Sequence, residues 1–322
     1  MRYRFPAVPA AAAAVAIALL SGGCSSNNAA ASSPPVEKHT LIVGAVPVAD
    51  SAALYIAQQR GFFRDQGLNV KIEPIISGAN AITGQLADKY DVVLGNYVSY
   101  ILADAVNKDK FRVLAPGAAD SANDSALLVP PGSPIQSVAD LKGKTIAVNA
   151  LNNIGTVFIT SVLSEYAMGL KADHIRLVVV PFPLMSQALK THKVDAAWMV
   201  EPFVTYAEMA GAQPLADTNA GATQNLPLGG YMVTQSWEQK YPGTADAFRR
   251  ALRQGQEVAA SNSPAVWRGL EKYAGMPSSV AEIISLPNYP LANQGEELQR
   301  VANLMLQYNM LSQNFDVNQM LR

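Results

Sequence analysis

Strand-type and helix-type segments alternate twice along this chain of 322 residues, and this alternation constrains the fold more than any other feature. Apolar runs rich in β-branched residues predict strands, and longer segments that end at glycine or polar residues predict helices. The first set has strands at 40–46, 69–76 and 91–95, with helices at 52–66, 79–89 and up to 107. The second has strands at 144–148, 175–180 and 194–199, with helices at 155–168, 185–191 and 204–209. This order implies parallel sheets covered by helices on both faces, so we predict an α/β protein.

The two sets resemble each other at their third strands. Residues 89–100 and 193–204 each contain Lys-x-Asp, then an apolar strand, then polar residues at the carboxyl end of that strand. We therefore predict two lobes built to one plan.

Two apolar segments, at 126–129 and 230–233, bracket the second set. The remaining residues, 235–322, are mostly helical by pattern, with helices expected near 244–259, 264–274, 278–284 and 296–308. Because this tail has no sheet of its own, it must pack on an existing lobe. We expect residues 39–125 and 232–322 to form lobe 1 and residues 126–231 to form lobe 2. Two crossovers between lobes make a hinge with a cleft.

The N-terminus indicates export. A basic start, an apolar run and small residues before Cys24 are typical of a secretory signal peptide, here residues 1–23. The run is shorter than the roughly 20 residues of a transmembrane helix. The small residues before Cys24 resemble a bacterial lipobox, which implies a lipid (diacylglycerol and palmitate) on this thiol and a membrane anchor on the extracytoplasmic side of the cell membrane. An ordinary cleaved signal with an incidental cysteine is the alternative. Residues 24–38 are rich in Ser, Asn, Ala and Pro, and we expect a flexible tether.

Composition excludes several classes of function. The net charge is −1 with 15% charged residues, and no basic stripe or zinc spacing is present, so we expect no nucleic-acid partner. The chain has no nucleotide-binding glycine motif and no nucleophile beside a base. His39, His174 and His192 are scattered and lack metal-site spacing. We predict a protein that is not an enzyme and has neither a metal nor a cofactor.

Ligands of open α/β sheets bind beyond the carboxyl ends of the strands, and those ends supply the candidate contacts. Asn149 to Thr156 follows a strand and opens a helix, where free backbone N–H groups can hold an acceptor, although plain helix capping explains the same residues. The aromatic candidates could instead pack in the core. The predicted ligand-binding residues are Pro47, Asp50, Ser51, Tyr55, Ser77, Gly78, Asn96, Tyr97, Asn149, Asn152, Asn153, Ile154, Gly155, Thr156, Trp198, Glu201 and Tyr231.

The charge of these loops favours one kind of ligand. None of them contains Lys or Arg, whereas Asp50, Asp120, Asp124 and Glu201 lie in or near them. An anionic ligand would depend on helix N-termini and amide groups alone. The loops therefore favour a neutral, cationic or zwitterionic small molecule.

Over about residues 40–235 the chain resembles the lipid-anchored substrate-binding proteins of bacterial ABC importers of the nitrate/sulfonate/taurine and pyrimidine-precursor type. The resemblance is carried by Leu54–Ala57 with Arg60–Phe63, by Ser137–Val148 with its DLKGK run, and by Asp195–Trp198 with Glu201–Phe203. It implies a two-lobed type II periplasmic-binding-protein (Venus-flytrap) fold that closes on a small molecule and delivers it, as a monomer, to a permease with an ATPase partner.

The family places ligand contacts at the same loops, but it does not name the ligand. Its thiamine-pyrimidine synthase branch is enzymatic and uses a cysteine-rich motif, which is missing here because Cys24 is the only cysteine. An enzyme acting on a small heterocycle and a sensory lipoprotein remain the alternative hypotheses.

Overall fold

The structure is a computed structural model that describes residues 35–107, 110–167 and 174–321. The predicted signal peptide, Cys24 and the tether up to residue 34 lie outside these ranges. Within them, no helix combines the length and the apolar character that crossing a membrane requires.

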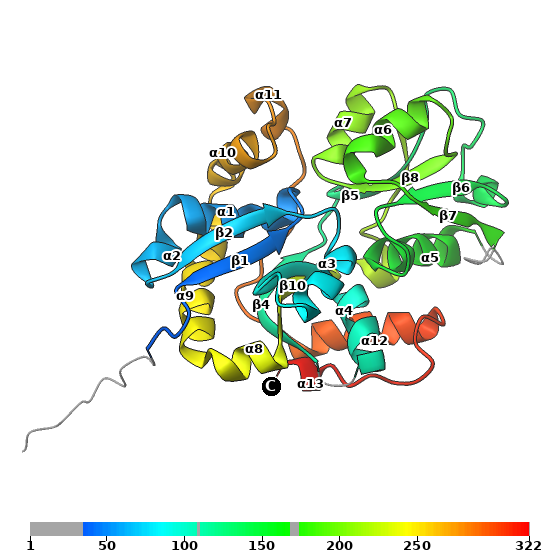
Figure 1. Ribbon diagram of the computed structural model, residues 1–322. Helices are drawn as coiled ribbons and strands as arrows, with labels where there is room; N and C mark the ends of the chain where they lie inside the picture. The colour runs from blue at the N-terminus through cyan, green and yellow to red at the C-terminus, as the bar shows by residue number, and fades with distance from the viewer. Residues whose placement is uncertain (1–34, 108–109, 168–173, 322) are drawn as a thin grey trace, which may run out of the picture. The chain divides into compact units, whose positions relative to one another are not determined.

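The first sheet has the strand order β2-β1-β3-β10-β4. Strand β1 (Thr40–Ala45) pairs in parallel with β2 (Asn69–Pro74) and β3 (Val92–Asn96). Strand β10 (Pro227–Thr234) is antiparallel to both β3 and β4 (Phe111–Ala119). The three parallel strands are those of the first predicted set, and this sheet and its helices form the first lobe (Figure 1).

The second sheet repeats this arrangement, with the order β7-β6-β8-β5-β9. Strands β7 (Arg176–Val179), β6 (Thr145–Val148) and β8 (Ala196–Val200) are parallel. Strand β5 (Ser125–Val129) is antiparallel to β8 and to β9 (Gln213–Asp217). The prediction of an α/β fold with two sheets is confirmed.

Equivalent hydrogen bonds show that the two lobes share one plan. In the first lobe the backbone N–H of Ile42, in β1, donates to Oδ2 of Asp91 at 2.9 Å. In the second, the backbone N–H of Thr145, in β6, donates to Oδ2 of Asp195 at 2.8 Å. Both carboxylates belong to the Lys-x-Asp segments that precede the third strand of each set.

Helices cover the faces of both sheets. In the first lobe these are α1 (Ala52–Gln59), α2 (Phe62–Asp65), α3 (Gly78–Leu86) and α4 (Tyr97–Asn107). The second lobe has α5 (Ile154–Tyr166), α6 (Phe182–Lys190) and α7 (Phe203–Met209). The helix predicted over 52–66 is two helices, because Gly61 adopts φ +81° between them, a left-handed conformation that favours glycine.

The C-terminal tail packs largely on the first lobe. It contains α8 (Gln235–Lys240), α9 (Pro242–Ser261), α10 (Ser263–Tyr273), α11 (Ser278–Ala281), α12 (Gly295–Gln307) and α13 (Asn318–Leu321) (Figure 1). Helix α9 approaches α1 so closely that a Cβ on Gly255 would lie 2.3 Å from the carbonyl oxygen of Ala53. A glycine is therefore needed at this crossing.

The sequence pattern did not indicate β4, β9 or α8. Strand β4 carries Pro116 and Gly117, and β9 carries Pro214, residues that weaken a strand signal. Strand β10 joins the first sheet from Pro227 onward, a few residues before the predicted return at 231.

The end of the predicted tether belongs to the body of the protein. The carboxylate of Glu37 accepts hydrogen bonds from the backbone N–H groups of Gly243 and Thr244, at 3.0 and 2.9 Å, in the first turn of α9. A carboxylate is favoured at this end of a helix by the helix dipole. Lys38 pairs with Asp91 at 2.5 Å. The expected flexibility of residues 24–38 is therefore wrong for residues 37 and 38.

The two crossovers between the sheets lie side by side. One connects β4 to β5 through residues 120–124, and the other connects β9 to β10 through residues 218–226. The backbone N–H of Asp120 donates to the carbonyl of Leu226 at 2.9 Å, and that of Thr218 donates to the carbonyl of Ser125 at 3.3 Å. Paired connections of this kind form a hinge between two lobes.

Candidate functional site

A cavity of about 70 Å³, the central cavity, lies beyond the carboxyl ends of parallel strands from both sheets. The first lobe, including its strands β4 and β10, contributes the lining residues Val46, Val48, Asp50, Gly78, Leu94, Gly95, Asn96, Ala118, Leu228 and Gly229. The second lobe contributes Asn149, Asn153, Ile154, Phe182, Trp198 and Val200. This is the position at which open α/β sheets bind ligands.

Asp50 lies in the loop after β1, and this loop is held from several directions. The hydroxyl of Ser51 donates to the carbonyls of Val46 and Val48. The hydroxyls of Tyr273 and Tyr289, in the tail, donate to the carbonyls of Val48 and Ala49, both at 2.9 Å. Such a loop holds the Asp50 carboxylate at a fixed place on the cavity wall.

The loop after β1 also contacts the second lobe, because the backbone N–H of Ala49 donates to the carbonyl of Glu201 at 3.1 Å. In this conformation the lobes therefore meet directly beside the cavity.

The pKa of Asp50 is raised to about 7. Burial is the main cause and the nearby Asp120 carboxylate adds to it, whereas a hydrogen bond from its own backbone N–H lowers the pKa. The carboxyl group therefore changes its charge near neutral pH. Glu201, which is buried beside the cavity, has its pKa raised to about 7 by burial, against hydrogen bonds from Thr205.

The N-terminus of α5 supplies amide groups. Asn153 occupies the N-cap position in an extended conformation, but its side chain does not cap the helix. Its Nδ2 instead donates to Oδ1 of Asn149 at 2.7 Å, and its own Oδ1 is buried with no partner among the described residues. Buried polar atoms in proteins are nearly always hydrogen-bonded, so an oxygen with no partner among the described residues is an unusual feature of the cavity wall.

Trp198 forms an aromatic wall of the central cavity. Its ring stacks on Phe158 with centroids 5.8 Å apart and lies 5.9 Å from Phe182, which also lines the cavity. Its Nε1 donates to the hydroxyl of Thr218 at 3.4 Å. A Cβ on Gly155 would lie 2.6 Å from the ring, so the backbone of α5 presses directly against it. Trp198 is thus both a core residue and part of the site.

Glycines form the opposite wall. A Cβ on Gly78 would lie 2.6 Å from the Cα of Gly95, and one on Gly229 would lie 2.4 Å from the carbonyl oxygen of Gly95. These close approaches leave bare backbone facing the cavity, so the wall of the first lobe is formed partly by peptide groups.

The structure brings seven of the predicted residues together at the cavity: Asp50, Gly78, Asn96, Asn149, Asn153, Ile154 and Trp198. The other ten predicted residues do not line it. They are Pro47, Ser51, Tyr55, Ser77, Tyr97, Asn152, Gly155, Thr156, Glu201 and Tyr231.

Four of these ten residues have structural contacts that explain their positions. Ser77 caps α3 by accepting from the backbone N–H of Asn80, and Tyr55 stacks on Tyr273 with ring centroids 3.8 Å apart. Ser51 supports the loop that carries Asp50, as described above. The Glu201 carboxylate accepts from the backbone N–H and hydroxyl of Thr205, at 3.1 and 2.7 Å.

The remaining predicted residues differ in exposure. Asn152 is exposed at φ +51°, and Pro47 is half-buried. Tyr231 is fully buried in β10. Gly155 and Thr156 lie in the first turn of α5, where the Thr156 hydroxyl is buried without a partner in the described residues. Tyr97 lines a second cavity, described below.

Sequence reasoning missed nine lining residues: Val46, Val48, Leu94, Gly95, Ala118, Phe182, Val200, Leu228 and Gly229. All are apolar or glycine, and such residues carry no chemical signal in a single sequence. Phe182 lies in the loop at 181–184, after the strand predicted at 175–180. Its aromatic side chain was the one feature that could have identified it as a ligand contact.

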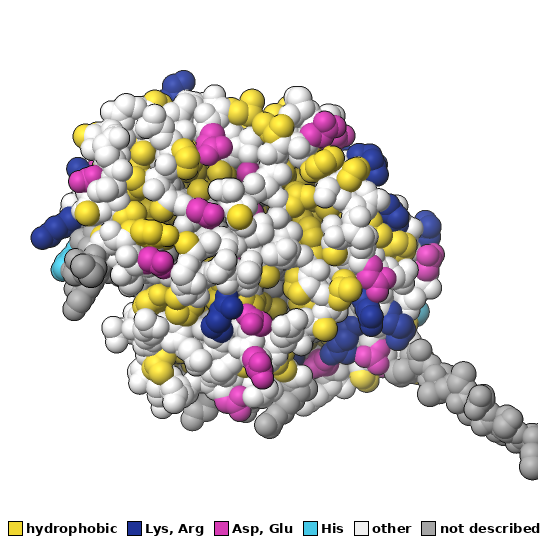
Figure 2. Space-filling model, turned by 180° about the vertical axis from the view of Figure 1, so that it is seen from behind, with side chains coloured by type: hydrophobic (Ala, Val, Ile, Leu, Met, Phe, Trp, Pro, Cys, Tyr) yellow, Lys and Arg dark blue, Asp and Glu magenta, His cyan; other side chains and the backbone are white. Residues whose placement is uncertain are grey.

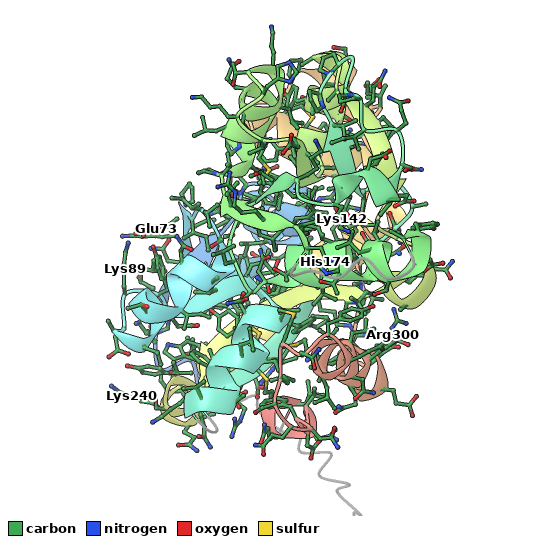
Figure 3. All side chains as sticks on the ribbon, turned by 90° about the vertical axis from the view of Figure 1, so that its right-hand side faces the viewer. Glu73, Lys89, Lys142, His174, Lys240 and Arg300 are labelled. Carbon is green, nitrogen blue, oxygen red and sulfur yellow. The ribbon has the colours of Figure 1, made fainter. Side chains whose placement is uncertain are left out.

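The second cavity has a volume of about 440 Å³ and includes residues of β4, the second crossover and α12, among them Arg300. Arg300 projects from α12 (Figure 3), where it pairs with Glu297 at 2.9 Å and donates to the carbonyl of Gln224 at 2.5 Å. The second cavity is larger than the central one. However, the central cavity is bounded by both lobes and contains the buried Asn153 oxygen, so we regard it as the candidate site.

Two carboxyl groups are buried in the first crossover. Asp120 accepts from the hydroxyl of Ser125 at 2.9 Å, while both oxygens of Asp124 lack a donor among the described residues. Burial and the neighbouring Asp120 raise the pKa of Asp124 well above its usual value. In the described part of the chain, no group of three or more His, Cys, Asp or Glu side chains is placed to hold a metal ion.

Solved structures with the same fold are numerous. The alkanesulfonate-binding protein SsuA from Xanthomonas axonopodis pv. citri matches with a TM-score of 0.74 and 19% identity, over 89% of this chain and 99% of that chain. The ligand-binding component of an ABC-type import system from Staphylococcus aureus matches with a TM-score of 0.75 and 10% identity, over 88% and 97% of the two chains. The desulfurization enzyme DSZB matches with a TM-score of 0.66 and 15% identity, over 88% and 96%. The fold is therefore that of the two-lobed periplasmic binding proteins.

Sequence comparison leads to the family. YtlA of Bacillus subtilis is 22% identical over 221 residues, which are 66% of this chain and 63% of YtlA. The nitrate import ATP-binding protein NrtC of Synechocystis is 23% identical over 293 residues, which are 85% of this chain but 43% of NrtC. This chain thus spans less than two thirds of either relative. The family described as NMT1/THI5 like matches residues 48–265, and the chain belongs to that family.

Proposed function

We propose that this protein is the extracytoplasmic solute-binding component of an ABC import system. It captures a small organic molecule in the central cavity and delivers it to a permease and its ATPase. The observation that carries the proposal is the cavity itself, which is bounded by two lobes joined by paired crossovers and has in its wall a buried acceptor with no partner among the described residues. The functions of the similar import proteins support the same proposal.

The lining of the cavity favours a protein that binds a small molecule over an enzyme that converts it. Among its lining residues Asp50 is the single titratable side chain, and no serine, cysteine or lysine nucleophile lies beside a base there. A general acid–base reaction generally needs a positioned partner for the group that moves the proton. We therefore propose a binding protein that is not an enzyme.

An enzymatic role is the second candidate, because DSZB shares the fold and Asp50 has a pKa of about 7, which suits a general base. This candidate predicts turnover of a bound small molecule by the isolated protein and its loss in Asp50→Asn. A bound molecule that is recovered unchanged after prolonged incubation contradicts it.

We also propose that Cys24 is lipidated after removal of residues 1–23, so that a tether ending near residue 36 holds the protein, as a monomer, on the extracytoplasmic side of the cell membrane. Glu37 and Lys38 support this end point, since both are bound to the body. Mass spectrometry of the membrane fraction tests the anchor, because Cys24→Ala should release the protein.

Native mass spectrometry of the freshly purified protein, followed by scattering, tests the main proposal. We expect a co-purified small molecule and a smaller radius of gyration when it is bound, because hinge closure shifts the population toward the compact state. Asn153→Gly should weaken binding, whereas the matched Asn152→Gly, at an exposed residue outside the cavity, should not. Equal binding by both variants, or an unchanged radius with ligand bound, contradicts the proposal.

A further inference from the structure

The lining of the central cavity becomes negative as the pH rises through about 7. Asp50 is the single ionisable side chain among its lining residues, and no Lys, Arg or His contributes to it. Two further carboxyl groups, on Asp120 and Asp124 in the crossover, lie close enough to interact electrostatically with Asp50. An anion bound here would meet a carboxylate without a cationic side chain to offset it.

This charge is local to the cavity. Figure 2 shows acidic and basic side chains interspersed on one face of the molecule. The net charge of the whole chain is −1. The negative lining therefore does not follow from a generally acidic protein.

The polar side chains of the cavity wall include both donors and acceptors. Asn96 and Asn149 each use Oδ1 as an acceptor, and their Nδ2 groups have no acceptor among the described residues. The Asn153 side chain is fully buried; its Nδ2 donates to Asn149, and its Oδ1 has no donor among the described residues. The Asp50 carboxylate receives a hydrogen bond from its own backbone N–H and is otherwise available. Two acceptors of this kind are satisfied by a ligand that carries N–H donors.

The N-terminus of α5 acts in the opposite sense, since it carries roughly half a positive charge and would favour an acceptor. Above neutral pH the full charge of the Asp50 carboxylate outweighs that partial charge, and the Asn153 oxygen stands at the same helix end. The aromatic rings of Trp198 and Phe182 are also compatible with a cation, which is attracted to the face of an aromatic ring.

We propose that the central cavity binds a small organic ammonium ion, with Asp50 as its counter-ion and Asn153 Oδ1 as a second acceptor for its N–H groups. This inference rests on the proposed function and deepens it by naming the class of solute. The volume of about 70 Å³ is less than half of the roughly 150 Å³ of a cavity that holds benzene, so the closed conformation suits a molecule of a few heavy atoms.

The affinity should depend on pH in a defined direction. Because burial raises the pKa of Asp50 to about 7, its carboxylate becomes fully charged only above neutral pH. The titratable groups that interact with Asp50 are the carboxyls of Asp120 and Asp124 and the hydroxyls of Tyr231, Tyr273 and Tyr289. None of these is a cation, so an ammonium ligand should bind more tightly at pH 8 than at pH 6, with release of a proton.

The experiment measures binding of matched probes to the full-length protein by calorimetry and thermal shift. Ethylammonium and ethanolamine represent the cations, ethanesulfonate and nitrate the anions, and ethanol the neutral molecules. We expect the ammonium probes to bind, with an affinity that increases several-fold from pH 6 to pH 8. Asp50→Asn should weaken their binding at least tenfold, and the matched exposed change Asp88→Asn should leave it unchanged.

The outcomes separate this inference from the proposed function. Binding of ethanesulfonate, nitrate or ethanol without binding of an ammonium probe overturns the inference and leaves solute capture standing. Equal affinity of the wild type and Asp50→Asn for an ammonium probe also overturns it. If no probe binds and no small molecule co-purifies, both the proposed function and the inference fail.

Discussion

Replacement of Gly155 by alanine should damage both stability and binding, because it adds a methyl group against Trp198. The new Cβ would lie 2.6 Å from Cε3, 2.9 Å from Cζ3 and 3.1 Å from Cδ2 of the indole ring. Ordinary contacts begin near 3.4 Å, so the ring must move by several tenths of an ångström. Phe158 and Phe182 pack near the Trp198 ring, so the empty space into which the ring can move is the central cavity.

The magnitude follows from two opposed effects. Overpacking of a close-packed core costs about 1–3 kcal/mol, and replacing glycine in a helix gains up to about 1 kcal/mol. Gly155 lies in the first turn of α5, where the helix-propensity gain is smaller than in the interior. We expect a net loss of about 1–2 kcal/mol in the free energy of unfolding. We also expect at least a tenfold loss of ligand affinity, because the ring then occupies part of the cavity.

Gly269→Ala is the matched control. Gly269 lies inside α10, and its new Cβ would meet Tyr273 at an ordinary 3.5 Å. The same chemical change should therefore stabilise the protein there by about 0.5–1 kcal/mol. Urea unfolding measures both variants, and calorimetry with a bound molecule measures affinity. A Gly155→Ala protein with unchanged stability and unchanged affinity would refute the assignment of Trp198 as a wall of the site.

Two further predictions concern buried carboxyl groups. Asp91→Ala should lower the free energy of unfolding by about 2–3 kcal/mol, because the Trp237 Nε1 and Ile42 N–H groups both lose their acceptor; urea unfolding that matches the wild type would contradict this. Asp124→Asn should stabilise the protein more at pH 8 than at pH 5. A carboxyl whose pKa is raised by folding contributes stability below its unfolded value and loses that contribution as pH rises through the raised pKa. Thermal unfolding across pH tests the sign, and a difference between the proteins that grows toward low pH would show that it is wrong.

The parallel strands were predictable from sequence because each is a short apolar run between polar turns. The three parallel strands of each sheet were found in this way, within one or two residues of their ends. The antiparallel strands β4 and β9 were not found, since their prolines and polar residues weaken the pattern and their pairing is decided by distant chain segments.

The candidate site was predictable where it uses polar residues at strand ends. Asp50, Asn96, Asn149 and Asn153 follow this rule, and the structure places all four at the cavity. Twelve of its sixteen lining residues are aliphatic, aromatic or glycine, and nine of these were not predicted because only tertiary packing selects them. Gly229 illustrates the difficulty, because it lines the cavity through a close approach to Gly95 that is remote in sequence.

The duplicated segments show why position alone does not decide the role of a residue. Asn96 is the last residue of β3, and Glu201 directly follows β8. Each accepts a hydrogen bond from the first turn of the next helix, Asn96 from the Ser99 N–H at 2.9 Å and Glu201 from the Thr205 N–H at 3.1 Å. The short Asn side chain makes this bond at the strand end and still lines the cavity. The Glu201 carboxylate is also bound to the Thr205 hydroxyl, and its backbone carbonyl receives the Ala49 N–H of the other lobe. Asn96 and its counterpart Val200, the last residues of β3 and β8, both line the cavity, whereas the next residue of the second lobe, Glu201, contacts the other lobe instead.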